Sequence, residues 1–234
     1  MNKKDVANHM SDFLKENGFK KKGNRFFKLE GCCLFAINFE PCSSIRPGFF
    51  IYPLYYPFDI ASLSFGNHLC YYKNRNFCDL NRESSEFEFE AWISKLKNIL
   101  SNDVFVHLEK INSLPKLSKF LDTGYYDVKR YWSVSIKDYY MLRSYTDFIM
   151  GRKDEMKKDI EMGIYWINKF GTHEHIKSKW ENQLEILNDK FDTPSNEKTI
   201  FVDSIVENTL SVCLGKNWKS LIGNSSIFTV DFSN

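Results

Sequence analysis

Residues 19–40 read FKKKGNRFFKLEGCCLFAINFE and divide into three short runs at Gly23-Asn24 and Glu30-Gly31. Glycine next to a polar residue between two such runs marks a tight turn. In the third run, residues 32–40, large apolar side chains stand at every second position, the period of a β-strand: Phe35, Ile37 and Phe39. The stretch therefore predicts an antiparallel meander of three strands.

The segments around this meander predict one helix before it and one strand after it. Apolar residues between Val6 and Leu14 share one helical face, and Asn17-Gly18 suits a helix end, so we expect a helix over about residues 3–17. Phe49 to Tyr56 predicts a further strand. Pro53 has no N–H for the ladder and should lie at an edge or a bulge. Residues 63–80 show no assignable pattern.

The chain becomes helical after residue 85. Ser85-x-x-Glu88 forms a capping box ahead of a helical pattern that continues to Leu100, and shorter helices are expected at about 104–112 and 115–122. No proline occurs from Lys116 to Thr193, where amphipathic stretches follow one another. Four such helices are predicted around residues 141–149, 156–167, 176–191 and 202–213. A final strand over 227–232 would return to the sheet.

These patterns predict an α+β fold, in which an N-terminal antiparallel sheet with packing helices precedes a C-terminal antiparallel helical bundle. The expected domains are residues 1–124 and 125–234, either sharing one core or separate. The two helices that flank Gly151 resemble one tetratricopeptide-type hairpin. No second copy occurs at a 34-residue period, so a repeat array is not expected.

Composition excludes several classes of function. Thirty-two Lys and Arg against thirty Asp and Glu leave a net charge of +2, too balanced for strong non-specific attraction to nucleic acid. No run of about eighteen apolar residues predicts a membrane span, and the N-terminus has no signal-peptide pattern, so we expect a cytoplasmic protein. Its six cysteines are scattered, as in a protein with reduced thiols.

Motifs for catalysis and cofactor binding are missing from the sequence. It contains no phosphate-binding glycine loop, no G-x-S-x-G nucleophile turn and no H-E-x-x-H zinc motif. His68-x-Cys70 with Cys78 is the best alternative for a metal, but the paired C-x-x-C knuckles of a structural zinc site are lacking. The sequence therefore predicts no catalytic, cofactor-binding or metal-binding residues, although an enzyme with an unrecognised site stays an alternative.

Positive charge gathers on the first hairpin of the meander, where Phe19, Phe26 and Phe27 lie between the basic residues Lys20, Lys21, Lys22, Arg25 and Lys28. Aromatic rings beside cations can stack bases and bind phosphates, so a nucleic-acid site here is one hypothesis. The competing interpretation places the phenylalanines in the core and the lysines on a solvated face.

A second cluster is aromatic and consists of Tyr52, Tyr55, Tyr56 and Phe58. Tyrosine is frequent at interfaces because it offers a large contact area and a hydroxyl. Because Pro53 interrupts the strand, this segment is expected to lie at an incompletely paired sheet edge. The cluster is therefore the candidate site for a protein partner, with ordinary core packing as the alternative.

A family resemblance rests on Leu14, Gly18-Phe19-Lys20-Lys21, Gly23-Asn24, Phe26-Phe27 and Ile37-Asn38-Phe39. These residues resemble the bacterial domain of unknown function 4304 family over the first half of the chain, with Glu40 where the family commonly has Gln. The resemblance implies an α+β module. Its members are similar in kind to small cytoplasmic proteins found beside bacterial toxin systems, which implies a non-enzymatic protein-binding module, such as an immunity protein.

Overall fold

The structure is a computed structural model that describes residues 2–41, 44–57, 65–68, 80–81, 83–170, 174–223 and 227–232. The chain forms two compact units. The first, here called the sheet unit, comprises Met1–Ile51, Phe65–Leu117 and Arg130–Ser133; the second, the helical unit, comprises Tyr52–Ser64, Ser118–Lys129 and Val134–Asn234. The chain therefore passes between the units several times, rather than once at the expected position 124.

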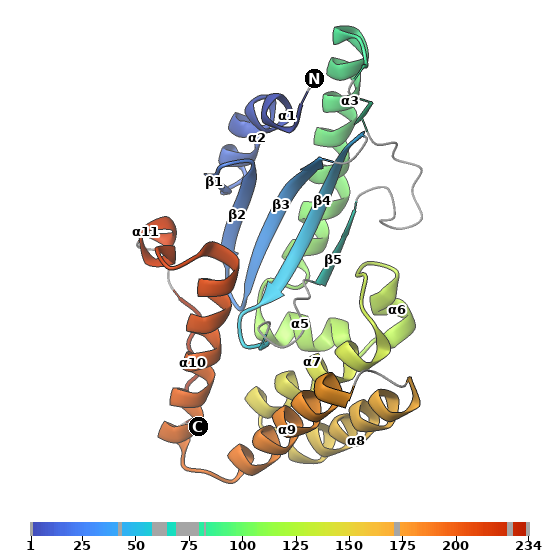
Figure 1. Cartoon of the computed structure of the whole chain (residues 1–234). Helices are drawn as coiled ribbons and strands as arrows, with labels where there is room; N and C mark the ends of the chain where they lie inside the picture. The colour runs from blue at the N-terminus through green and yellow to red at the C-terminus, as the bar shows by residue number, and fades with distance from the viewer. Residues whose placement is uncertain are drawn as a thin grey trace. The chain divides into compact units, whose positions relative to one another are not determined.

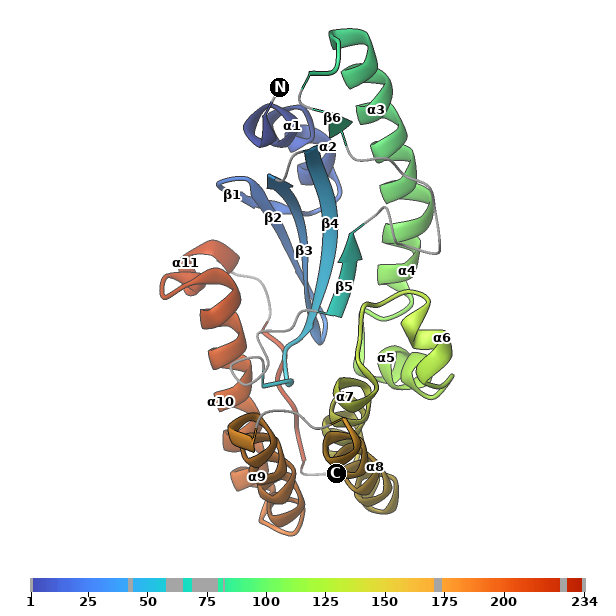
Figure 2. The ribbon, with the colours of Figure 1, turned by 45° about the vertical axis from the view of Figure 1, so that its right-hand side comes forward.

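The predicted α+β fold is confirmed, and the sheet begins with the predicted meander. Its strands lie in the order β1-β2-β3-β4-β5, with β6 paired to β4. Figure 1 shows α3 (Glu86–Ile99) running alongside these strands, and Figure 2 shows β6 near the N-terminal half of β4. The strand bounds are β1 Lys20–Lys22, β2 Arg25–Glu30, β3 Cys33–Pro41, β4 Ser44–Pro53, β5 Phe65–His68 and β6 Leu80–Asn81.

The register explains why the two faces of the meander differ. Lys21 pairs with Phe26, and Phe26 pairs with Ile37, so these residues share one face of the sheet. On this face Phe26 and Ile37 are buried, and the Lys21 ammonium donates to Asn8 in the first helix. The N-terminal helix therefore covers this face of β1–β3.

Strand β4 differs from the expectation of an edge. It lies between β3 and the pair β5 and β6, and Pro53 is its last residue. Residues 44–45 of β4 pair with β6, and residues 48–51 pair with β5. Pro47 falls between these two stretches, so its missing N–H removes no bond from either pairing. An interior strand can thus contain prolines.

The helices of the sheet unit follow the predicted positions with two differences. The first helix is divided at Met10 into α1 (Lys3–His9) and α2 (Ser11–Glu16). The helix that begins at the Ser85 capping box does not stop near Leu100. It continues through α3 (Glu86–Ile99), a π-helical segment (Leu100–Phe105) and α4 (Val106–Glu109).

Later helices also match the sequence pattern. Pro115 lies in the first turn of α5 (Leu114–Leu121), and α6 (Tyr125–Lys129) follows. The helical unit then contains the four predicted helices, and a short helix ends it. The bounds are α7 Ile136–Ile149, α8 Lys153–Lys169, α9 Glu174–Phe191, α10 Ser195–Leu214 and α11 Trp218–Ile222.

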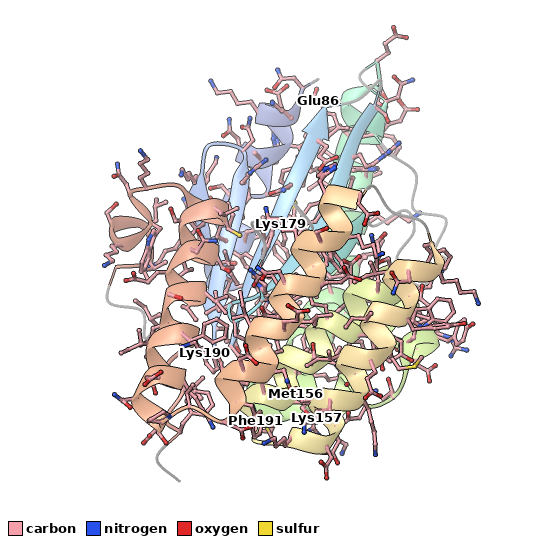
Figure 3. The ribbon with its side chains drawn as sticks, turned by 60° about the horizontal axis from the view of Figure 1, so that its bottom comes forward. Glu86, Met156, Lys157, Lys179, Lys190 and Phe191 are labelled. Atoms are coloured by element: carbon pink, nitrogen blue, oxygen red, sulfur yellow. The ribbon has the colours of Figure 1, made fainter. Side chains whose placement is uncertain are left out.

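Close packing joins α7, α8 and α9. Gly151 turns the chain between α7 and α8 with a φ of +70°. At Gly163 of α8, a Cβ would lie 3.5 Å from Leu184 of α9 and 3.8 Å from Tyr140 of α7. Figure 3 labels Met156 and Lys157 near the start of α8 and Phe191 at the end of α9, where Lys153 pairs with Asp192. The two helices are therefore antiparallel neighbours.

The expected final strand is not formed. Residues 227–232 have no strand hydrogen bonding and instead follow α10, where the hydroxyls of Ser195 and Thr199 donate to the carbonyls of Phe232 and Val230 at 2.8 and 3.3 Å. The Phe232 ring packs edge-on against Phe148 of α7. The alternating pattern of this segment thus serves packing on helices.

Candidate functional site

Helix α8 carries a second apolar stripe in addition to the one that packs inside the helical unit. The buried stripe contains Met156, Ile160, Gly163 and Ile167. The second, here called the α8 stripe, has members three and four residues apart, which places them on one face of the helix: Met162, Tyr165, Trp166, Lys169 and Phe170. A surface helix normally needs only one apolar stripe.

The α8 stripe is open to solvent. Met162, Tyr165 and Phe170 are 36%, 51% and 61% exposed, and Trp166 is half-buried. Single exposed apolar residues are common, but adjacent large ones mark surfaces that bind other molecules. Tyrosine, tryptophan, phenylalanine and methionine are also the side chains enriched at protein interfaces.

Contacts within the stripe hold its rings in place. The Trp166 and Phe170 rings stack with centroids 5.4 Å apart and an interplanar angle of 20°. Tyr165 meets Trp166 edge-on at 5.2 Å. The Lys169 ammonium lies 4.7 Å from the Trp166 centroid and 5.5 Å from that of Tyr165. A preorganised aromatic surface loses little side-chain entropy when a partner binds.

The charges beside this face have both signs. Lys158 lies one turn before Met162, and Lys169 lies among the rings; both lysines are exposed. Glu155, one turn before Lys158, and Glu161, one turn before Tyr165, are exposed acidic residues. Lys169 is thus the charge that lies among the rings and could attract a carboxylate of a partner.

A buried ionic network fixes α8 against α7. Arg143 Nε of α7 lies 2.9 Å from the Asp159 carboxylate of α8. Arg152, between the helices, pairs with Asp147 of α7, and both arginines reach Asp122 after α5. Asp147 is fully buried and Asp159 nearly so. The α8 stripe thus lies on a helix held by several charge-assisted contacts.

Two carboxyl groups of this network have raised pKa values. Burial raises the pKa of Asp159 to about 8; Arg143 opposes this shift, and a hydrogen bond with the neighbouring Asp147 adds to it. Burial also raises the pKa of Asp147, against the effects of Arg152 and of the Asp159 hydrogen bond. The negative charge of Asp147 also disfavours ionisation of Asp159, which adds to the effect of burial at Asp159.

Tyr55 and Tyr56 of the tyrosine cluster do not lie at the exposed sheet edge that was predicted for a protein partner. Tyr55 and Tyr56 are fully buried in the helical unit, so the prediction of an exposed edge is wrong for these two residues. The Tyr56 N–H donates to the Pro53 carbonyl, and this turn directs the chain away from the strand. Burial raises the pKa of Tyr56 well above its ordinary value. Tyr52 is half-buried, and Phe58 lies outside the described residues.

The basic hairpin forms as predicted, but much of it is engaged within the chain. Phe26 is fully buried and Phe27 is 8% exposed, so neither ring offers a face for base stacking. Lys21 donates to Asn8 Oδ1 at 2.9 Å, and Lys28 pairs with Glu30 at 2.7 Å. Lys20, Lys22 and Arg25 remain at the surface of the hairpin.

No metal-binding cluster of three or more His, Cys, Asp or Glu residues occurs in the part of the chain that the structure describes. Cys70 and Cys78 of the alternative metal site lie outside that part. Cys32 and Cys33 are buried, and burial raises the pKa of the Cys33 thiol well above its ordinary value. None of the described helices is both long and apolar enough to cross a bilayer.

The α8 stripe is not among the features predicted from the sequence, although the sequence contains a signal for it. The predicted helix has only the stripe that includes Ile160 and Ile167. The spacing of Met162, Tyr165 and Trp166, continued by Phe170, is an equally regular helical period. Two apolar stripes on one helix predict that one of them stays uncovered or meets a partner.

Comparison of the chain with known protein families, with curated proteins and with solved structures finds no match. The α8 stripe, with its rings and lysines, is therefore the feature from which a function is inferred.

Proposed function

We propose that this protein is a non-enzymatic protein-binding module and that the α8 stripe is its docking face. The observation that carries the proposal is the exposure of Tyr165 and Phe170 on either side of Trp166, in rings already held by mutual stacking. Covering such surface releases free energy of about 25 cal/mol per Å² of apolar area, and ordered rings require little further ordering.

The partner is a protein with an apolar patch flanked by carboxylates. Lys158 and Lys169 lie on the same face as the rings and would attract such carboxylates during encounter. The Lys169 ammonium already lies over the Tyr165 and Trp166 rings and brings positive charge into the middle of the stripe.

The resemblance of residues 14–39 to the domain of unknown function 4304 family supports a narrower form of the proposal. By analogy with proteins found beside bacterial toxin systems, the partner is a toxin, the compartment is the cytoplasm, and binding confers immunity. Fold resemblance by itself does not establish function. This narrower form is therefore tested separately from the docking face.

The docking face is tested with Tyr165→Ala combined with Phe170→Ala. The tagged protein is used to recover a partner from the source organism, and the purified partner is then titrated calorimetrically. Each central aromatic anchor contributes about 2 kcal/mol or more, so each single variant should weaken binding by roughly 30-fold and the double variant by roughly 1,000-fold. Lys158→Gln with Lys169→Gln should weaken binding less and reduce its dependence on salt.

Tyr126→Ala is the matched control. Tyr126 is 79% exposed in the same unit, on α6, and lies outside the stripe. This variant should bind normally, and all variants should keep the wild-type stability to within roughly 0.5 kcal/mol. Undiminished binding by the double variant, or an equal loss in Tyr126→Ala, would reject α8 as the docking face.

Immunity is tested by co-expression with a toxin encoded beside this gene. Wild-type protein should restore growth, and the Tyr165→Ala, Phe170→Ala variant should not. If a partner binds through α8 but the wild-type protein gives no protection, the binding module stands and the immunity role is rejected.

A further inference from the structure

A cavity of about 270 Å³ opens at the turn of the β1–β2 hairpin, far along the chain from α8. Its lining comes from the start of α1, the hairpin and the end of β3, all within the sheet unit. The residues are Lys3, Lys22, Asn24, Arg25, Asn38, Phe39 and Glu40. Neither the candidate site on α8 nor the core of the sheet explains this gathering of polar side chains.

Strand register brings three of these residues into one row. Lys22 of β1 pairs with Arg25 of β2, which pairs with Asn38 of β3. Paired residues lie on the same face of a sheet, so the three side chains leave the sheet on one side. Glu40 lies two residues beyond Asn38 and shares that face.

Asn38 is the unusual member of the row. It is 8% exposed, and its Oδ1 is buried and accepts no hydrogen bond from any described residue. Buried amide oxygens in folded proteins nearly always have a donor, because leaving one unmet is unfavourable. This oxygen has almost no accessible surface, so a ligand that donates a hydrogen bond reaches it only when the Asn38 side chain turns toward the cavity that Asn38 lines.

The charge of the cavity is positive. Lys3, Lys22 and Arg25 contribute three cations, against the single carboxylate of Glu40. Within the described part of the chain, neither Lys3 nor Arg25 has a carboxylate at ion-pair distance. An arginine guanidinium binds phosphate through two parallel hydrogen bonds, and a lysine adds a point charge.

We propose that this cavity binds a small phosphomonoester that carries a hydroxyl group. Arg25 and Lys3 hold the phosphate, with Lys22 beside them, and the Asn38 side chain turns toward the cavity so that its Oδ1 accepts a hydrogen bond from the hydroxyl. The volume is near the lower end of small-molecule sites, which are typically about 300–1,000 Å³.

The residues around the cavity favour a small ligand over a polynucleotide. A nucleic-acid site needs a track of cations that follows the phosphates, together with open aromatic faces. Beyond the cavity, the Lys21 ammonium is held by Asn8 and lies 5.6 Å from the centre of the Phe26 ring, and Lys28 is paired with Glu30. Three cations therefore gather at the cavity, and the exposed Lys20 lies outside its lining.

The test is a titration of the ¹⁵N-labelled protein followed by NMR, with inorganic phosphate, glucose 6-phosphate and glucose as probes. The Arg25 Nε–H and the Asn38 side-chain amide report on the cavity directly. Both phosphates should give saturable shifts of the Arg25 signal, glucose 6-phosphate should bind more tightly and also shift the Asn38 amide signal, and glucose should shift neither signal. Absence of saturable shifts with both phosphates up to roughly 10 mM, where even weak specific sites fill, would overturn the proposal.

Variants distinguish the phosphate contact of Arg25 from the hydroxyl contact of Asn38. Arg25 is exposed, so Arg25→Gln should fold normally and weaken both phosphates by roughly tenfold or more. Asn38→Ala should weaken glucose 6-phosphate and leave inorganic phosphate nearly unchanged. Lys20→Gln removes a charge from the same hairpin outside the cavity and should bind like wild type. Equal binding by wild type and Arg25→Gln would contradict the assignment, as would salt-sensitive binding of a single-stranded oligonucleotide without binding of either phosphate.

Discussion

Tyr55 is held by a relay of hydrogen bonds within the helical unit. Its hydroxyl donates to Thr146 Oγ1 at 3.0 Å, and the Thr146 hydroxyl donates to the Leu142 carbonyl one turn earlier in α7 at 2.8 Å. The ring itself is fully buried. A side chain that is both buried and hydrogen-bonded contributes to stability through packing and through its polar group, and the two contributions can be separated by substitution.

We expect Tyr55→Phe to lower the free energy of unfolding by about 1 kcal/mol, because it removes one hydrogen bond and leaves the ring. Tyr55→Ala should lower it by about 3–5 kcal/mol, because it also leaves a cavity. Urea denaturation followed by circular dichroism measures both changes. Tyr126→Phe is the exposed control and should have almost no effect. An unchanged stability of Tyr55→Ala would place the ring at the surface.

At the scale of elements, two hairpin turns of the meander use glycine for different reasons. Gly23, between β1 and β2, and Gly31, between β2 and β3, have φ values of +60° and +55°. A Cβ at Gly23 would meet no atom within 4 Å. At Gly31 it would lie 1.8 Å from the Asn112 carbonyl oxygen, in the segment between α4 and α5. The second turn is therefore also a packing contact.

Gly23→Ala should lower the free energy of unfolding by about 1–2 kcal/mol, the strain of a left-handed conformation with a side chain. Gly31→Ala should lower the free energy of unfolding by about 1–3 kcal/mol more than Gly23→Ala does, because backbone atoms must also move apart. Chemical denaturation of the two variants in parallel measures the difference. Equal losses would show that the segment near Asn112 does not press on this turn.

At the scale of the whole molecule, two buried acids make stability depend on pH in an uncommon direction. Burial raises the pKa of Asp159 to about 8 and that of Asp138 to about 6, although a hydrogen bond from Ser135 opposes the shift at Asp138. Unfolded aspartate releases its proton near pH 4. Between these values the folded state holds more protons, so raising the pH favours unfolding.

We therefore expect the free energy of unfolding to fall as the pH rises from about 4 to about 8. Above pH 8 these two groups should contribute little further change. Asp159→Asn keeps a hydrogen-bond donor and cannot ionise in either state, so it should match wild type near pH 4, be more stable than wild type at pH 7, and lose much of the decline between pH 4 and 8. Thermal unfolding across this range measures both. A large loss for Asp159→Asn at pH 7 would mean that an ionised Asp159 is needed beside Arg143.

Local patterns in the sequence determined most of the elements. Alternation around Phe35 to Phe39 and turns at glycine predicted the meander, and helical spacing predicted α7 to α10, because the periods of strand and helix are imposed by backbone geometry within a few residues. The short strands β5 and β6 had no such signal. They pair with β4 across a long stretch of chain, and a strand of two or four residues is too short to show a period.

Only the tertiary structure decided which aromatic side chains reach the surface. Tyr55 and Tyr165 both lie in local clusters of rings, yet the first is fully buried and the second is 51% exposed. Burial depends on which distant segments pack over a residue, and for Tyr55 these include α7, which follows about 80 residues later. The same holds for Asn38 in the cavity wall. Its place in the alternation of β3 is local, but whether any described residue donates a hydrogen bond to its amide oxygen depends on the segments that pack around it.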